Sequence, residues 1–158
     1  MNDKVIWNYL LGKINNPYGV AGLMGNLYAE SGLNPRNLQG SYESKLGYSD
    51  DSYTEAVDSG RYSAYDFAHD KAGYGLAQWM YWSRKEKLYN FAKDRSSSIG
   101  DLSTQLDYLW SELQDYPDVI DALRNAKTVR QASDVVLTRN ERPTNQGDAV
   151  KQKRAGYG

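Results

Sequence analysis

Apolar side chains recur every three or four residues along most of this chain, which is the spacing of amphipathic helices. One helix is predicted from Pro17 to just before Asn34, because proline suits a first helical turn and the Asn-Pro pair ends it. Val20, Leu23 and Leu27 form its apolar face. About six or seven helices are expected in all, the others at the N-terminus, over 49–57, and beginning near Ser83, Asp101, Pro117 and Thr128.

Three of these helix starts carry capping signals. Ser83 and Thr128 each lie three residues before a Glu or a Gln, the spacing of a capping box, and Asp101 is a suitable N-cap. The stretch "NERP" at 140–143 is expected to stop the helix that follows Thr128, and the basic tail from Asp148 is predicted to be helical.

The periodicity weakens from Arg36 to Lys71, where tyrosines, serines and acids follow one another without a clear apolar face. A long segment of this kind in a compact domain is usually functional or flexible. The sequence therefore predicts an α+β fold that is predominantly α-helical, with one helical core and a small irregular or β lobe between Glu30 and Gln78.

Two glycines, Gly22 and Gly25, lie inside the helix predicted from Pro17, where glycine lowers helix stability. A side chain at either position would keep neighbouring parts of the chain further away. Their presence therefore predicts that another element approaches this helix closely.

Length and charge limit the classes of protein that this chain can belong to. The 158 residues suffice for one domain, predicted to span 1–158, and are few for two. A net charge of −1 argues against binding of duplex nucleic acid, which requires a basic face. No apolar run is long enough to span a membrane and no signal peptide is recognised. Neither nucleic acid nor a membrane is expected as a partner, and the chain is expected to be a domain of a longer protein or one released without the usual secretion route.

The chain contains no cysteine, which excludes disulfides, thiol nucleophiles and thiolate metal sites. Its one histidine, His69, cannot form a multi-histidine metal site alone, and no Gly-x-Ser-x-Gly nucleophile turn is present for a catalytic triad. We therefore expect chemistry without a metal or cofactor.

The aromatic residues are dominated by rings with a polar tip: 14 Tyr and 4 Trp against 2 Phe. Such rings suit a wet site that stacks on a flat, hydroxylated ligand such as a sugar. Tyrosines that cover an ordinary protein surface are the alternative.

Glu30 falls on the apolar face of the helix from Pro17, in its last turn. Apolar neighbours and the negative end of the helix dipole both disfavour a charged carboxylate there. A neutral carboxyl group is what a general acid needs near neutral pH. The alternative is a solvated or salt-bridged residue at a helix end.

A second stretch, from His69 to Trp79, contains Tyr74 between two glycines, followed by Gln78. The glycines let the backbone approach a ligand closely, and the Gln78 amide offers both a donor and an acceptor. A tight turn with a buried glutamine is the alternative.

Taken together, "MGNLYAESGLNP" (24–35), "GYGLAQW" (73–79) and "ERP" (Glu141–Pro143) occur in an order that resembles the phage tail lysozyme family. This family is found in tail-associated lysins and endolysins of phages of Gram-positive bacteria. It is distantly similar to goose-type lysozymes and soluble lytic transglycosylases. The resemblance covers nearly the whole chain and implies a lysozyme-like helical domain with a substrate cleft.

The resemblance also implies roles for individual residues. Glu30 matches the acid that protonates the glycosidic oxygen between the alternating amino sugars of peptidoglycan. Tyr74 and Gln78 match a segment that lines the substrate cleft, and Trp79 is either a sugar platform or a core tryptophan. The late "ERP" is interpreted as structural.

Hydrolysis requires a second carboxylate, either to activate water or to act as nucleophile. Several acids lie in the segment that follows Glu30. Asp70 is chosen because it precedes the glycine turn, as an aspartate does in goose-type lysozymes, although the spacing differs. A surface acid beside Lys71 is the alternative. If no acid reaches the cleft, the resemblance implies a lytic transglycosylase in which a single acid also acts as base.

The predicted function is that of a muramidase that hydrolyses the β-1,4 bond between N-acetylmuramic acid and N-acetylglucosamine. A lytic transglycosylase, an N-acetylglucosaminidase and a non-catalytic wall-binding or tail module remain as alternatives. The expected partners are peptidoglycan glycan strands of Gram-positive bacteria and other lysin domains, such as a peptidase or wall-binding module. The expected location is the phage tail or the bacterial cell wall.

Overall fold

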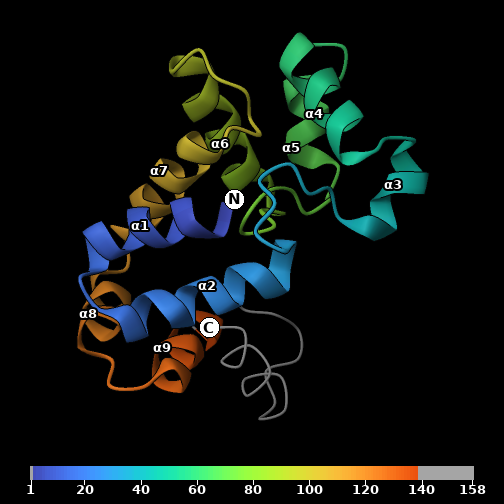
Figure 1. The fold of residues 1–158 in the computed structure, drawn as a ribbon. Helices are drawn as coiled ribbons and strands as arrows, with labels where there is room; N and C mark the ends of the chain where they lie inside the picture. The colour runs from blue at the N-terminus through green and yellow to red at the C-terminus, as the bar shows by residue number, and fades with distance from the viewer. Residues whose placement is uncertain (1, 139–158) are drawn as a thin grey trace. The chain divides into compact units, whose positions relative to one another are not determined.

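The computed structural model describes residues 2–138, which are mostly α-helical (Figure 1). The chain falls into two compact units. The first contains the chain up to Leu33 and again from Trp110, and the second contains Asn34–Leu109. The single domain predicted over 1–158 stays a prediction.

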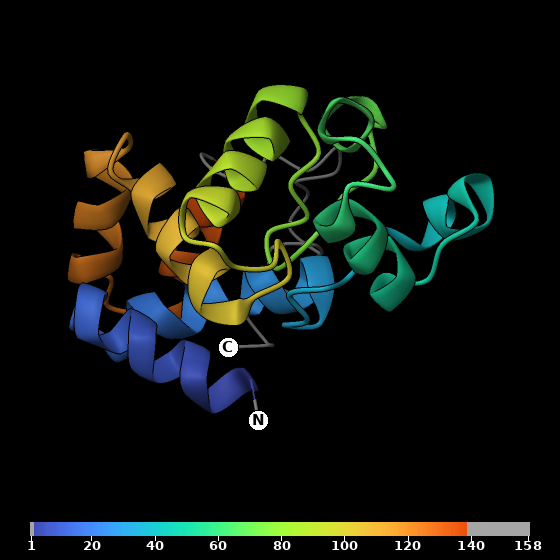
Figure 2. The same cartoon turned by 90° about the horizontal axis from the view of Figure 1, so that it is seen from above.

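The first unit is built around α2 (Pro17–Ser31). Three other helices of this unit contact α2: α1 (Asn2–Ile14), α8 (Pro117–Asn125) and α9 (Val129–Val136). The last residues of α7 (Leu102–Leu113) also belong to it. In both views the first two helices, drawn in blue, run beside each other (Figures 1 and 2).

Local chemistry explains where α2 begins. Asn16 is its N-cap, with a side-chain oxygen that accepts a hydrogen bond from the N–H of Tyr18 at 3.2 Å, and Pro17 is the first helical residue. The Asn16 amide nitrogen also donates to the carbonyls of Leu123 and Ala126, each at 2.9 Å. One residue therefore starts α2 and ties it to the end of α8.

Glycines on α2 allow close packing, as the sequence predicted. A Cβ atom on Gly22 would lie 2.5 Å from the Cβ of Ala132 in α9, and one on Gly19 would lie 2.2 Å from the carbonyl oxygen of Leu123 in α8. Real side chains do not approach this closely, so only glycine fits at either position. The prediction of a close approach is confirmed at Gly22.

The core of the first unit consists of aliphatic side chains that are excluded from solvent. They include Ile6, Leu10, Ile14, Val20, Leu23, Leu27, Leu113, Val119, Leu123 and Val136.

The second unit contains four complete helices and most of α7. They are α3 (Gly40–Leu46), α4 (Asp50–Ser59), α5 (Ala64–His69) and α6 (Trp82–Asp94), and α5 packs against α6. The helix predicted over 49–57 is confirmed as α4. Residues 2–138 therefore hold nine helices, more than the six or seven expected.

The excess arises in the segment from Arg36 to Lys71, where α3 and α5 were not predicted. These helices are short, and their boundaries depend on local hydrogen bonds rather than on a long apolar face. The Ser63 hydroxyl accepts from the N–H of Asp66 at 3.0 Å and caps α5, while Gly47 ends α3 in the left-handed conformation. Short capped helices carry too little periodicity to be recognised from the sequence.

The small β lobe is not seen in the part of the chain that the structure describes. Its extended backbone is limited to isolated bridges that join Leu38 to Tyr74 and Tyr74 to Trp79. The segment between Glu30 and Gln78 is instead occupied by α3, α4, α5 and the turns between them.

Two of the predicted N-caps are confirmed, although only half of the capping box predicted at Thr128 forms, because the Gln131 side chain accepts from the N–H of Lys127 and not from that of Thr128. A carboxylate oxygen of Asp101 accepts from the N–H of Thr104 at 2.9 Å at the start of α7, and the Thr128 hydroxyl accepts from the N–H of Gln131 at 3.0 Å at the start of α9. In each case the capping residue and its partner are three positions apart, so the sequence signal for the start of the helix lies within four consecutive residues.

The capping box predicted at Ser83 is wrong. The α6 helix begins at Trp82, and Tyr81, at the N-cap position, makes no side-chain capping bond. The stop at 140–143 and the helical tail from Asp148 lie outside the described residues. None of the helices within 2–138 combines the length and apolar character needed to cross a membrane.

The glycine packing of α2 gives a stability prediction. Gly22→Ala should lower the free energy of unfolding by about 1–3 kcal/mol, because the added methyl group would overlap Ala132 in α9. Gly12→Ala is the matched control, since Gly12 lies inside α1 with nothing within 4 Å of its added Cβ. That variant should be more stable than the parent by about 0.5–1 kcal/mol. Urea unfolding of the three proteins measures both changes, and equal effects of the two substitutions would contradict the close contact.

Candidate functional site

Glu30 is the penultimate residue of α2. Leu23 and Leu27, on the same face of the helix, are fully buried, whereas Glu30 is only half-buried. The carboxylate therefore lies where the apolar face of α2 reaches solvent. A general acid requires this combination of partial shelter and access to substrate.

A tight turn fixes the end of the helix that carries Glu30. Gly32 is in the left-handed conformation with φ 64°, and its N–H donates to the carbonyl of Tyr28 at 2.8 Å. Leu33 follows with φ 63°, a conformation that costs a non-glycine residue about 1 kcal/mol. Such strain persists only where the surroundings impose it, and Leu33 is buried. The position of Glu30 is thus set by a defined backbone and not by a loose helix end.

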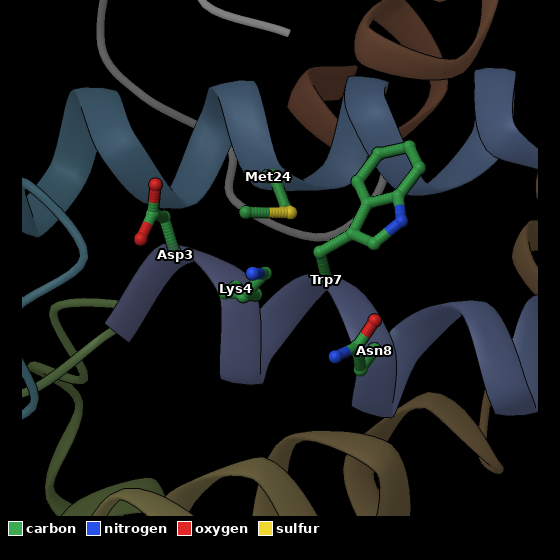
Figure 3. Close-up of a pocket in the computed structure, with 5 residues that line it drawn as sticks. All are labelled: Asp3, Lys4, Trp7, Asn8 and Met24. Atoms are coloured by element: carbon green, nitrogen blue, oxygen red, sulfur yellow. The ribbon is translucent and has the colours of Figure 1, made fainter. Parts of the chain in front are cut away.

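A hollow of about 550 Å³ lies between α1 and α2 in the same unit (Figure 3). Asp3, Lys4, Trp7 and Asn8 of α1 and Met24 of α2 line it, and the Trp7 ring reaches toward α2. None of these residues was predicted to line a site, although Met24 begins the family-like segment 24–35. Trp7 is half-buried at a helix face, which periodicity alone assigns to packing.

The second predicted stretch forms a tight loop in the second unit. Tyr74 and Trp79 exchange two backbone hydrogen bonds, each at 3.0 Å, so the four residues between them form the loop. Gly75 has φ 82°, and Gln78 also has a positive φ of 50°. The side chain of Gln105 supports the loop by accepting from the N–H of Leu76 at 2.9 Å. The tight turn of the alternative interpretation is present, but its glutamine, Gln78, is half-exposed and not buried.

The rings at the two ends of this loop face the protein interior. Both Tyr74 and Trp79 are fully buried, and the Tyr74 hydroxyl hydrogen-bonds with that of Thr54. Their assignment to substrate binding stays a prediction. For Trp79, the burial agrees with the alternative interpretation, a core tryptophan.

Gln78 is the predicted substrate-binding residue that keeps a polar atom available. Its amide nitrogen donates to the carbonyls of Asn37 and Gly75, at 2.9 and 3.0 Å. Its side-chain oxygen accepts no hydrogen bond from any residue within 2–138, and the side chain is half-exposed. This oxygen can accept a hydrogen bond from a ligand.

Asp70 lies directly after α5, and its side chain is only 4% exposed. One carboxylate oxygen accepts from the ammonium of Lys85 at 2.6 Å and from the N–H of Ala72 at 2.9 Å. The other oxygen accepts from the hydroxyls of Tyr53 and Tyr62. Both oxygens are therefore occupied by donors of the protein itself, and Asp70 is not the surface acid beside Lys71 that was the alternative.

Lys85 is the partner that the sequence analysis missed. It is fully buried in α6, where its ammonium also donates to the carbonyl of Ala72 at 2.8 Å and lies 4.4 Å from the centre of the Phe67 ring. Burial lowers the pKa of Lys85, and the contact with Asp70 opposes this shift. The signal that could have found it is its spacing, because Lys85 shares the apolar face of α6 with Leu88 and Ala92.

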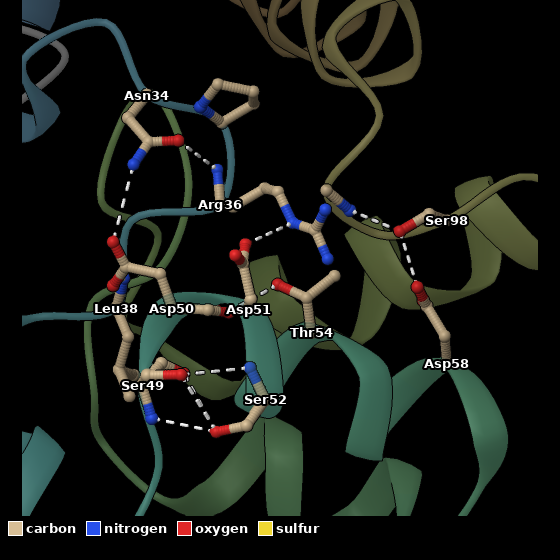
Figure 4. Close-up of polar contacts among 12 residues, drawn as sticks. Asn34, Arg36, Leu38, Ser49, Asp50, Asp51, Ser52, Thr54, Asp58 and Ser98 are labelled. Atoms are coloured by element: carbon tan, nitrogen blue, oxygen red, sulfur yellow. Dashed lines mark hydrogen bonds and ion pairs between the residues drawn. The ribbon is translucent and has the colours of Figure 1, made fainter.

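Other acids of the second unit hold loops in place (Figure 4). At the start of α4, Asp50 accepts from the N–H of Leu38 at 2.8 Å. Near the end of α4, Asp58 accepts from the N–H of Ile99 at 3.0 Å. No group of three or more His, Cys, Asp or Glu side chains within residues 2–138 is arranged to hold a metal ion.

Three tyrosines of the second unit have a raised pKa. For Tyr53 and Tyr62 the main cause is burial, reinforced by the negative charge of Asp70. For Tyr74 the cause is again burial, partly opposed by its hydrogen bond with Thr54. Each phenol is therefore kept neutral in the folded protein at a pH where it would ionise in the unfolded chain.

These shifts predict a loss of stability in alkali. An acid with a raised pKa in the folded state stabilises the protein below its unfolded pKa, here about 10, and this contribution is lost as the pH rises above that value. Because the phenols of Tyr53 and Tyr74 ionise in the unfolded chain but not in the folded protein, the free energy of unfolding should fall by about 3 kcal/mol for each pH unit above pH 10. The lowered pKa of Lys85 acts in the opposite direction up to about pH 10.5, so the steep fall should begin there.

Denaturant unfolding between pH 8 and 12, followed together with tyrosinate absorbance, measures the effect. Tyr74→Phe should reduce the slope by about 1.4 kcal/mol per pH unit. Ionisation of all 14 tyrosines near pH 10 without unfolding would contradict the burial of these phenols.

Comparison with known proteins identifies the family of this chain. The phage tail lysozyme family matches residues 1–157, which is essentially the whole chain. Among curated proteins, none matches it. The family name points to a lysozyme-type enzyme that acts on bacterial peptidoglycan. The match agrees with the resemblance based on the segments around Glu30 and Tyr74, and the chain therefore belongs to the phage tail lysozyme family.

Proposed function

We propose that this protein is a muramidase-type glycosidase that cleaves the β-1,4 bond between N-acetylmuramic acid and N-acetylglucosamine. Glu30 is its general acid. The observation that carries this proposal is the position of Glu30, half-buried at the end of α2 and followed by a strained turn, in a chain of a lysozyme family. A catalytic carboxyl group on a rigid helix is held in place before substrate binds.

The chemistry asked of Glu30 is proton transfer to the leaving oxygen. As the bond from the anomeric carbon to the glycosidic oxygen breaks, the carboxyl proton moves to that oxygen, and the sugar ring develops oxocarbenium character. The remaining step is capture of the anomeric carbon by water. Water attack requires either a second carboxylate as base or a nucleophile that forms a covalent intermediate.

Asp70 is the candidate for the second carboxylate, but its contacts restrict it. The Lys85 ammonium, the Ala72 N–H and two tyrosine hydroxyls occupy its oxygens, and its side chain is almost wholly buried. To activate water, Asp70 would first have to release one of these donors. The contacts are those of a structural carboxylate.

This restriction favours a second candidate, a lytic transglycosylase on the same polymer. There Glu30 alone would donate its proton to the leaving oxygen, and the resulting carboxylate would take the proton of a sugar hydroxyl as that hydroxyl attacks the anomeric carbon and closes an anhydro ring. An N-acetylglucosaminidase would cut the other linkage with the same acid. A wall-binding or tail module without catalysis would not require a carboxyl group at the end of α2.

The finer partners also belong to the proposal. We propose that the substrate is the glycan strand of Gram-positive peptidoglycan, and that other lysin domains act beside this one. The site of action is the phage tail or the bacterial cell wall. Family membership supports peptidoglycan as the substrate.

The role of Glu30 is tested by digestion of purified Gram-positive peptidoglycan with mass spectrometry of the products. Glu30→Gln should reduce cleavage by at least about 100-fold, because the amide cannot supply the proton. Glu55→Gln, an exposed glutamate on α4, is the matched control and should cleave like the parent. Reducing muramic acid ends indicate a muramidase, and anhydro ends indicate a transglycosylase. Full activity of Glu30→Gln would remove the assignment.

The role of Asp70 is tested by a pair of substitutions. Asp70→Asn leaves Lys85 buried without a charged partner, so it should lower the free energy of unfolding by about 3–5 kcal/mol. Adding Lys85→Met removes the unpaired charge and should restore much of that stability. We expect the double variant to cleave peptidoglycan at a rate close to that of the parent. A double variant that is folded but inactive would return Asp70 to the role of base.

A further inference from the structure

Exposed aromatic side chains gather where α5 ends and α6 begins, in the second unit. Tyr65 is 69% exposed, Tyr81 is 63% exposed and Trp82 is 44% exposed, and the exposed His69 ring lies between Tyr65 and Trp82. We call these four residues the aromatic platform. Exposed apolar side chains that form a contiguous patch of this kind often mark a binding site for a ligand or partner.

The rings of the aromatic platform are already ordered. The centres of the Tyr65 and His69 rings lie 4.0 Å apart, with an angle of 19° between the ring planes. His69 and Trp82 lie 5.5 Å apart at 12°, so three nearly parallel rings form a row from α5 to α6. The Tyr81 ring lies beside that of Trp82, with the ring centres 6.1 Å apart and an angle of 37° between the planes. Rings held by one another lose little freedom when a ligand binds, which lowers the entropic cost of binding.

The edges of the aromatic platform are polar. Nδ1 of His69 lies 2.9 Å from the carbonyl oxygen of Tyr65, and because a carbonyl only accepts, Nδ1 carries the hydrogen. In the neutral ring, Nε2 is then a hydrogen-bond acceptor. The hydroxyls of Tyr65 and Tyr81 form no hydrogen bond with other residues of the described chain. Because His69 is stacked between two rings, the faces that the surface offers are the outer faces of Tyr65 and Trp82, bordered by donors and an acceptor.

We propose that the aromatic platform is a binding surface for the glycan strand of peptidoglycan. The C–H faces of the amino sugars would stack on the outer faces of the Tyr65 and Trp82 rings, and their hydroxyl and acetamido groups would hydrogen-bond to the ring edges. The choice of a glycan as ligand rests on the proposed function. A protein-docking face would need an apolar centre of its own, and Met80 is the one large aliphatic side chain that is exposed and adjoins these rings along the chain.

The position along the chain supports this assignment. The segment predicted to line the cleft ends at Trp79, whose ring is buried. The exposed rings follow directly at Tyr81 and Trp82, after the half-exposed Gln78 with its available oxygen. Of the two interpretations given for Trp79, its burial agrees with a core tryptophan, and we propose the next tryptophan, Trp82, as the sugar platform.

Cosedimentation with insoluble Gram-positive peptidoglycan tests the proposal. The parent for this experiment is Glu30→Gln, so that cleavage does not remove the ligand. Adding Trp82→Ala or Tyr65→Ala should raise the Kd on the order of tenfold, because each removes one stacking ring. Adding Tyr18→Ala is the matched control, since Tyr18 is 51% exposed at the start of α2 in the other unit, and it should leave the Kd unchanged.

A soluble ligand and a sedimentation measurement complete the test. Oligosaccharides of N-acetylglucosamine should change the tryptophan fluorescence of the Glu30→Gln protein, and this response should be lost in its Trp82→Ala derivative. Circular dichroism establishes that each variant is folded. Binding by both ring variants that equals the parent's would overturn the proposal. So would platform variants that alter self-association in analytical ultracentrifugation but bind glycan normally, because the surface would then serve a second copy of the chain.

Failure of this proposal is distinguishable from failure of the proposed function. If the wild type lyses peptidoglycan but the ring variants bind it as the parent does, the platform proposal is refuted and the muramidase proposal stands. If glycan binding depends on Trp82 but the wild type cleaves nothing, the platform proposal is supported and the proposed enzymatic function is refuted.

Discussion

The buried ion pair between Asp70 and Lys85 is the contact on which the second unit depends. It joins the end of α5 to α6, and a lysine excluded from solvent cannot remain charged without such a partner. The pair is a neighbour of the aromatic platform along the chain. His69 directly precedes Asp70, and Trp82 lies about one helical turn before Lys85, so the buried charge pair and the parallel stack of the His69 and Trp82 rings join the same two helices. Two independent contacts, one buried and one exposed, therefore link the end of α5 to the start of α6.

A different constraint acts in the first unit, where shape and not charge positions the candidate acid. Gly19 and Gly22 let α2 lie against the backbone of α8 and α9, at distances that no larger residue permits. Glu30 belongs to the same rigid helix, and the turn at Gly32 and Leu33 ends that helix one residue later. Substitutions along the glycine face are therefore expected to move the carboxylate as well as to destabilise the core.

How much could be predicted from the sequence depended on how local the signal was. The course of α2 and the caps at Asp101 and Thr128 were predicted, because each rests on residues within three or four positions of one another. The short helices α3 and α5 were missed, since they are fixed by caps and by packing that periodicity does not report. Lys85 was missed because a charged residue on an apolar face is recognised as buried only once its partner, 15 residues away, is known.

The tyrosines of the second unit have two kinds of environment, and one of them, a hydroxyl bonded to a buried carboxylate, was not among the interpretations that composition left open. Tyr53 and Tyr62 are required as tyrosines and not as phenylalanines, because their hydroxyls satisfy the second oxygen of a buried carboxylate. Tyr65 and Tyr81 instead keep their hydroxyls at the surface, where a polar tip on a flat ring suits a hydroxylated ligand. Hydrogen bonding therefore distinguishes these tyrosines from phenylalanine at both places: the phenols of Tyr53 and Tyr62 replace water around Asp70, and in the proposed glycan complex those of Tyr65 and Tyr81 would replace water around a sugar.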